Sequence, residues 1–134
     1  MPDKSNSFAH LLATVLRPRR PWQLLLLMLI GIVCYLALTP APPKTLSLGW
    51  DKANHAAAFA ALTLAGCFGF QGSRRVVLAV LLALLAFGGL IEILQAYVPG
   101  RDSDWADLLA DTVGIVCGVV PALCALRLSR RSTA

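Results

Sequence analysis

The sequence predicts an all-α polytopic membrane protein with four transmembrane helices and an N-terminal interfacial amphipathic helix. Of its 134 residues, 57% are hydrophobic and only 14% are charged, a balance too apolar for an ordinary soluble domain. The apolar residues also gather into stretches close to the roughly 20 residues that a helix needs to cross a bilayer. These stretches cover residues 22–39, 53–70, 76–98 and 106–126.

A shorter amphipathic pattern precedes the first stretch and ends near Pro18. Its apolar residues recur with the spacing of one helix face, at Phe8, Leu11, Leu12, Val15 and Leu16. Because arginines follow it directly, we expect this helix to lie on the cytoplasmic membrane surface. Residues 1–21 then form a cytoplasmic N-terminal segment, residues 22–126 the four-helix domain, and residues 127–134 a basic cytoplasmic tail.

The four stretches differ in composition. The first is nearly pure Leu, Ile and Val and is longer than a signal-peptide core, so a retained helix is expected. The second is rich in Ala and Gly, so its neighbours should carry it into the bilayer. In the fourth, Gly114 and Gly118 form a G-x-x-x-G pair that permits close contact between helices. Packing within the bundle is the favoured interpretation, and a homo-oligomer through the same glycines is the alternative.

The basic residues predict the orientation. Most of the twelve Lys and Arg flank the first stretch, join the second to the third, or follow the fourth, which leaves Lys44, Lys52 and Arg101 at the other side. Both termini should therefore face the cytoplasm of a bacterial inner membrane. The net charge of +5 reflects this topology and attraction to anionic lipids, and nothing indicates a nucleic-acid partner. The four cysteines all lie in apolar stretches and are expected to be small buried hydrophobes.

Polar residues gather at the predicted outer ends of the last three helices. From the helical rise, His55, Glu92 and Asp111 should all lie roughly 8 to 9 Å below the outer boundary. Spacings of three, four and seven residues place the polar groups of each helix on one face, which predicts an outward-facing polar pocket. The candidate ligand-binding residues are Asp51, Lys52, His55, Glu92, Gln95, Arg101, Asp107 and Asp111.

Each of these groups has a structural alternative. Asp104 fits the N-cap of the fourth helix, Asp107 a first-turn acid favoured by the helix dipole, and Asp51 a cap of the second. Lys52 and Arg101 can pair with carboxylates or lipid phosphates. The deeper groups can instead form a buried network that holds the bundle together.

The same residues suggest chemistry. An imidazole beside carboxylates in a desolvated pocket is typical of general acid/base catalysis, with His55, Glu92, Asp107 and Asp111 as candidates. No resident cofactor and no metal motif are predicted. A divalent cation held by His55, Glu92 and Asp107 is an option on ligand chemistry alone.

The ordered motifs resemble the VanZ-like family of small integral membrane proteins related to the teicoplanin resistance protein VanZ. The resemblance covers roughly residues 24–118 and rests on D-K-x-x-H-x-x-x-F from Asp51, E-x-x-Q from Glu92, R-x-x-D-x-x-D from Arg101, and the glycine pair. It implies a bacterial cell-envelope protein and a link to glycopeptide resistance. Asp111 stands where the family pattern usually has Asn.

Three functions compete. The first is binding of a polar or phosphorylated head group of an envelope lipid or glycolipid, with membrane lipids as partners. The second is a membrane hydrolase or transferase acting on a phosphorylated lipid head group by acid/base or metal-assisted chemistry. The third is a proton- or ion-coupled transporter, which is ranked last because the inner halves of the helices carry no ionisable residue.

Overall fold

The computed structural model describes residues 4–40, 50–101 and 103–131. Lys44 and the outer parts of the predicted terminal segments and first loop lie outside these residues. The described chain is all-α, and its helices are α1 (Lys4–Leu16), α2 (Arg19–Leu38), α3 (Asp51–Gly69), α4 (Arg74–Gln95) and α5 (Trp105–Arg131). The predicted amphipathic helix and the four apolar stretches therefore all form helices.

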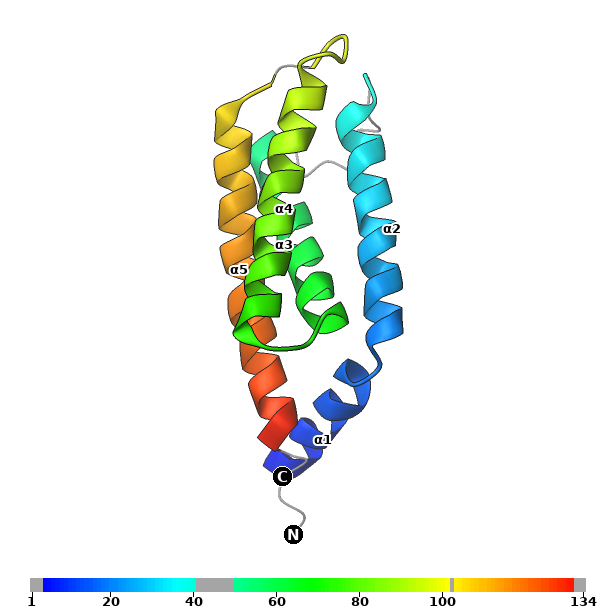
Figure 1. The fold of residues 1–134 in the computed structure, drawn as a ribbon, viewed down its shortest axis with the longest axis vertical. Coiled ribbons are helices and arrows are strands. Elements are labelled where there is room, and N and C mark those ends of the chain that lie inside the picture. Colours follow the sequence, from blue (N-terminus) through cyan, green and yellow to red (C-terminus); the bar gives the residue numbers. More distant parts are fainter. Residues whose placement is uncertain (1–3, 41–49, 102, 132–134) are drawn as a thin grey trace.

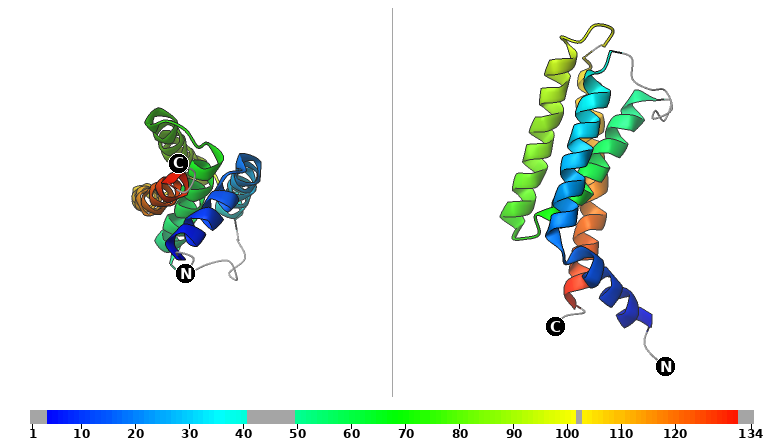
Figure 2. Two further views of the ribbon diagram at one scale, coloured as in Figure 1. Left: turned by 90° about the horizontal axis from the view of Figure 1, so that it is seen from below. Right: turned by 90° about the vertical axis from the view of Figure 1, so that its right-hand side faces the viewer.

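Helices α2 to α5 run alternately up and down and lie side by side (Figure 1). Their polar-rich ends, where α2 and α4 finish and α3 and α5 begin, meet at the upper end in Figure 1. The lower end holds α1 and the end of α5, and α1 leaves the bundle at an angle (Figure 2). The arginines that begin α2 and α4 and end α5 all lie at this lower end, as the charge pattern predicts.

Three helices, α2, α4 and α5, are long and apolar enough to cross a membrane. Helix α3 has a suitable length, but its first turns carry Asp51, Lys52, Asn54 and His55. It is nevertheless the helix that fills the centre of the bundle, and Phe59 and Leu62 are fully buried in it. The protein is thus a multi-pass membrane protein in which α3, with its polar first turns, packs against longer apolar helices.

Small residues let α3 and α5 approach each other closely. A Cβ atom added to Gly118 would lie 2.6 Å from the carbonyl oxygen of Ala60, and one added to Gly114 would overlap the carbonyl oxygen of Ala56. Both glycines are buried. The G-x-x-x-G pair therefore packs within the chain, and a homo-oligomer would need a surface other than these two glycines.

The cysteines are only partly as predicted. Cys67 is buried in the lower core with Phe68 and Ala122, but Cys117 and Cys124 are exposed. The expectation that all four are buried was wrong because α5 buries only the face that meets its neighbours, and these two side chains point elsewhere. All four are free thiols.

Candidate functional site

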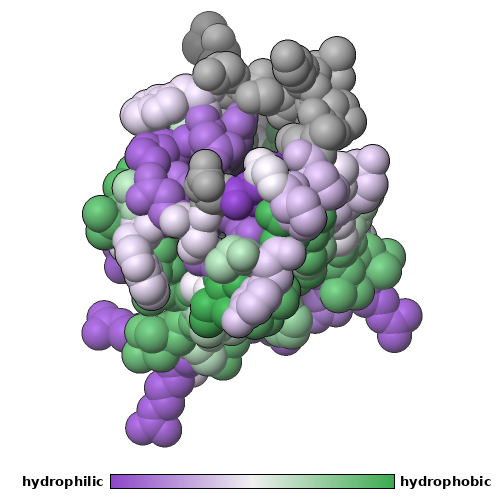
Figure 3. Space-filling view, turned by 90° about the horizontal axis from the view of Figure 1, so that it is seen from above, coloured by the Kyte–Doolittle hydropathy of each residue, from purple (hydrophilic) through white to green (hydrophobic). Residues whose placement is uncertain are grey.

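Hydrophilic residues gather at the upper end of the bundle, where apolar residues flank them (Figure 3). The buried polar side chains of the described chain are Thr63, Glu92, Gln95, Asp107 and Asp111. Thr63 is the one of these that lies on α3, and its hydroxyl donates to the carbonyl oxygen of Phe59 at 2.7 Å. The other four belong to the predicted outer set. Glu92 and Gln95 come from α4, and Asp107 and Asp111 come from α5.

Lys52 joins α3 to the start of α5. Its Nζ atom donates to Asp104 Oδ2 at 2.7 Å and to Asp107 Oδ1 at 3.2 Å. Asp104 Oδ1 also accepts a bond of 2.9 Å from the backbone N–H of Ala106, which is the bond expected of an N-cap. The structural interpretation of Asp104 is therefore confirmed, although the same side chain also pairs with Lys52.

We expect Asp104→Ala to lower the melting temperature by a few degrees, because both the cap and the Lys52 bond are lost. The bond from Lys52 is the main cause that lowers the pKa of Asp104 below its ordinary value of 3.8. A lowered pKa in the folded state stabilises the protein above the ordinary value, and this contribution disappears as the pH falls through the lowered pKa. Thermal unfolding in mild detergent at several pH values should show the difference from wild type shrinking below about pH 4. A difference that grows on acidification would contradict this assignment.

His55, which is partly buried, and Asp111, which is fully buried, form a pair between α3 and α5. The His55 Nδ1 atom lies 2.9 Å from Asp111 Oδ1, and the Asp111 side chain has no exposed surface. Its other oxygen, Oδ2, lies against Gly88 of α4, where a Cβ atom would overlap it. The missing side chain of Gly88 thus makes the space for the Asp111 carboxylate.

Glu92 lies one turn above Gly88 on α4 and therefore above the His55–Asp111 pair. Its Oε2 accepts a bond of 3.1 Å from the backbone N–H of Asp104. The expectation of one shared depth holds for His55 and Asp111 but not for Glu92. The predicted depth of Glu92 assumed that the helix continues to Val98, but α4 ends at Gln95 and the chain turns after it.

Gln95 and Arg101 fasten the end of α2. Gln95 Nε2 donates to the carbonyl oxygen of Ala37 at 3.2 Å, and Arg101 donates to those of Thr39 and Leu36. Carbonyl groups in the last turn of a helix lack partners within that helix. Both polar side chains therefore act as a C-terminal cap for α2 across the upper end.

We use the name upper cluster for the polar side chains at this end of the bundle, which are Asp51, Lys52, His55, Glu92, Gln95, Arg101, Asp104, Asp107 and Asp111. Among the described residues, three buried oxygens of the upper cluster have no hydrogen-bond partner. They are Glu92 Oε1, Gln95 Oε1 and Asp111 Oδ2. A buried acceptor without a donor costs about 1–3 kcal/mol, so such groups usually meet a water molecule, an ion, a proton or a ligand. What the cluster lacks is hydrogen-bond donors.

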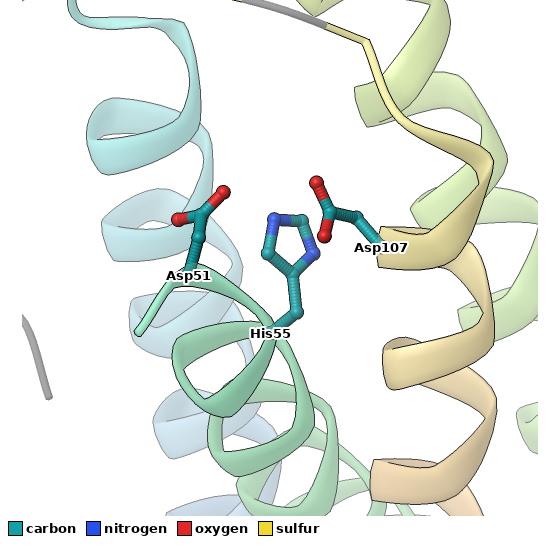
Figure 4. Close-up of side chains that lie close together, drawn as sticks. All are labelled: Asp51, His55 and Asp107. Carbon is teal, nitrogen blue, oxygen red and sulfur yellow. The ribbon is translucent and has the colours of Figure 1, made fainter. Parts of the chain in front are cut away.

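One group of side chains has metal-ligand chemistry. One ligand atom each from Asp51, His55 and Asp107 lies within 4.8 Å of the others, and the three side chains face a common space (Figure 4). Ligand bonds of about 2.1 Å would require these atoms to lie roughly 3.4 Å apart, so the group would have to contract. Lys52 already bonds to Asp107 and would compete with the ion. Among the described residues Glu92 is not in this group, so Asp51 takes its predicted place.

Comparison with protein-family models shows the family of this chain. A family model described as VanZ/LLP1 matches residues 7–127. The chain belongs to the VanZ/LLP1 family. The match runs from α1 to near the end of α5 and so includes every residue of the upper cluster. Neither the curated proteins nor the solved structures give a match.

Gly88 was not among the predicted site residues of this VanZ/LLP1 chain, although its missing side chain leaves the space for the Asp111 carboxylate. A signal was present, because Gly88 and Gly89 stand together inside an apolar stretch, one turn before a buried glutamate. Glycine within a helix is disfavoured by about 1 kcal/mol, and its presence beside a polar position often marks close packing.

Proposed function

We propose that this VanZ/LLP1 protein binds the head group of an envelope lipid or glycolipid in its upper cluster, and that the head group supplies hydrogen-bond donors. In this proposal α3 is a fourth membrane span, the membrane is the bacterial inner membrane, and both termini are cytoplasmic. The upper cluster then faces the outside, where such head groups are found. A role in teicoplanin resistance remains a prediction of the family resemblance.

The three unpaired buried oxygens carry this proposal. They lie on α4 and α5 in the upper part of the bundle, and they need hydroxyl, amine or amide donors. The two nearby cations are already engaged, since Lys52 bonds to two carboxylates and Arg101 to carbonyl groups of α2. The cluster therefore suits an amine or sugar better than a bare phosphate.

We expect Glu92→Gln to weaken binding of donor-bearing lipids by about tenfold or more, the value of a charged hydrogen bond. The glutamine oxygen can accept from the backbone N–H of Asp104 or from a head group, but its NH₂ group can accept from neither. The protein would be placed in nanodiscs of phosphatidylcholine, whose head group has no donor, mixed with phosphatidylethanolamine or a glucosyl diacylglycerol. Native mass spectrometry would then count the lipids that stay bound.

The control is Gln23→Leu, which removes an amide at the lower end that donates to Gly69 at 3.0 Å. This variant should retain the preference of wild type for donor-bearing lipids. Equal retention of all three lipids by wild type, or an unchanged preference in Glu92→Gln, would refute the proposal.

A second candidate function is hydrolysis of the same head group. The observation that favours it is the His55–Asp111 pair, in which a fully buried carboxylate orients an imidazole, as in sites that use histidine as a general base. The nanodisc experiment separates the two functions, because catalysis releases a head group into solution and binding alone does not. Transport stays third, because the buried ionisable groups of the described chain do not continue along the lower half.

A further inference from the structure

An apolar cavity lies between α2 and α4, below the polar cluster. Its volume is about 180 Å³, and it is lined by Leu26, Ile30, Phe70, Val80, Ala83, Leu84 and Phe87. We call this cavity the α2–α4 groove. Both helices are candidate membrane spans, so the groove lies at the depth of lipid chains.

Helix α2 is the loosely packed wall of the groove. None of its residues is buried, whereas α3 buries several residues of its lower half. At the upper end, Gln95 of α4 joins α2 by donating to the carbonyl oxygen of Ala37. The chain itself therefore leaves this side of the bundle incompletely filled.

The groove and the polar cluster lie along the same face of α4, with the buried Ile91 between them. Leu84, Gly88, Ile91, Glu92 and Gln95 are its buried residues, and their spacing of three and four residues defines a single face. Leu84 lines the groove, while Glu92 and Gln95 carry unpaired oxygens. This face of α4 is thus apolar in its lower half and rich in hydrogen-bond acceptors in its upper half.

We propose that the α2–α4 groove holds the hydrocarbon chain of the lipid whose head group meets Glu92 and Gln95. This inference rests on the proposed function and adds a site for the hydrocarbon chain, so that the lipid is recognised through head and chain together. The dimensions agree, because Val80 lies about 18 Å below Glu92 by helical rise. One leaflet of the hydrocarbon core is about 15 Å thick.

The test fills the groove with a large side chain. Ala83→Trp projects an indole into it from α4, and Leu26→Trp does so from α2. The matched control is Ala86→Trp, which lies one turn from Ala83 on α4, is exposed, and does not line the groove. Far-UV circular dichroism and thermal unfolding would verify that all three variants fold.

We expect both groove variants to retain at least about tenfold less lipid than wild type, because the indole would occupy the space that the hydrocarbon chain needs. The measurement is the nanodisc experiment above, and the loss should affect all three lipids. Ala86→Trp should retain lipid as wild type does. If Ala83→Trp and Leu26→Trp fold and keep their lipid, the groove proposal is overturned.

The two proposals fail separately. If Ala83→Trp keeps its lipid count while Glu92→Gln loses the lipid preference, the head-group proposal is supported and the groove proposal is not. A lost count in Ala83→Trp, with no preference in wild type, would leave the groove without a selective head-group site. If Ala83→Trp instead converts a dimer into a monomer, a second copy of the chain fills the groove and the proposal is overturned.

Discussion

Gly114→Ala is expected to lower the free energy of unfolding by about 2 kcal/mol or more, the range of overpacked cores. The new methyl group would occupy the position of the Ala56 carbonyl oxygen, which belongs to the backbone of α3 and cannot turn away. Helices α3 and α5 would have to separate along their length. Because α3 contributes Lys52 and His55, the polar cluster would be disturbed as well. Unfolding by SDS titration from mild detergent measures the change.

Gly89→Ala is the matched control for this substitution. No atom lies within 4 Å of a Cβ atom added to Gly89, so the change should only remove a residue that disfavours helix. We expect a gain of up to about 1 kcal/mol. Opposite signs for the two variants support the assigned packing. A loss of stability in Gly89→Ala equal to that in Gly114→Ala would contradict it.

His55→Leu is expected to destabilise the fold by about 3–5 kcal/mol, the cost of removing one partner of a buried pair. Asp111 would remain fully buried without the bond from Nδ1, and its second oxygen has no partner to compensate. Part of the cost should fall when the carboxylate takes up a proton. The effect should therefore be smaller at acidic than at neutral pH in the same SDS titration.

The double variant His55→Leu with Asp111→Leu tests whether the cost arises from the pair. Removing both polar groups leaves no buried charge, so the double variant should be more stable than His55→Leu alone. The two effects would then be far from additive. If they add fully, His55 and Asp111 act independently, and the 2.9 Å contact contributes nothing to stability.

Most of the helices could be predicted from the sequence, because membrane spans depend on local composition. A run of apolar residues is sufficient to place α2, α4 and α5. Helix α3 is different, since Asp51, Lys52 and His55 make it too polar to qualify by composition. Its central position depends on the glycines of α5 and on polar partners from other helices, which composition does not reveal.

The site was predicted as a set of residues but not as a set of contacts. Helical spacing placed the polar residues of each helix on one face. The prediction that His55 and Asp111 lie at the same depth agrees with their contact. The partners of Arg101 could not be foreseen, because its bonds go to backbone carbonyl groups of α2, more than 60 positions away in the chain. Backbone acceptors are present at every residue and leave no pattern in the sequence.

By itself, the sequence determined that this chain forms membrane-spanning helices with polar groups at one end, because hydrophobicity and helical periodicity are local properties. Only the tertiary structure decided how those groups meet. Contact between α3 and α5 through Gly114 and Gly118, and the space left by Gly88, bring His55 to Asp111 and leave three buried oxygens unpaired. Hydrogen bonding depends on distances of a few tenths of an ångström between helices, and these are fixed by how the helices pack.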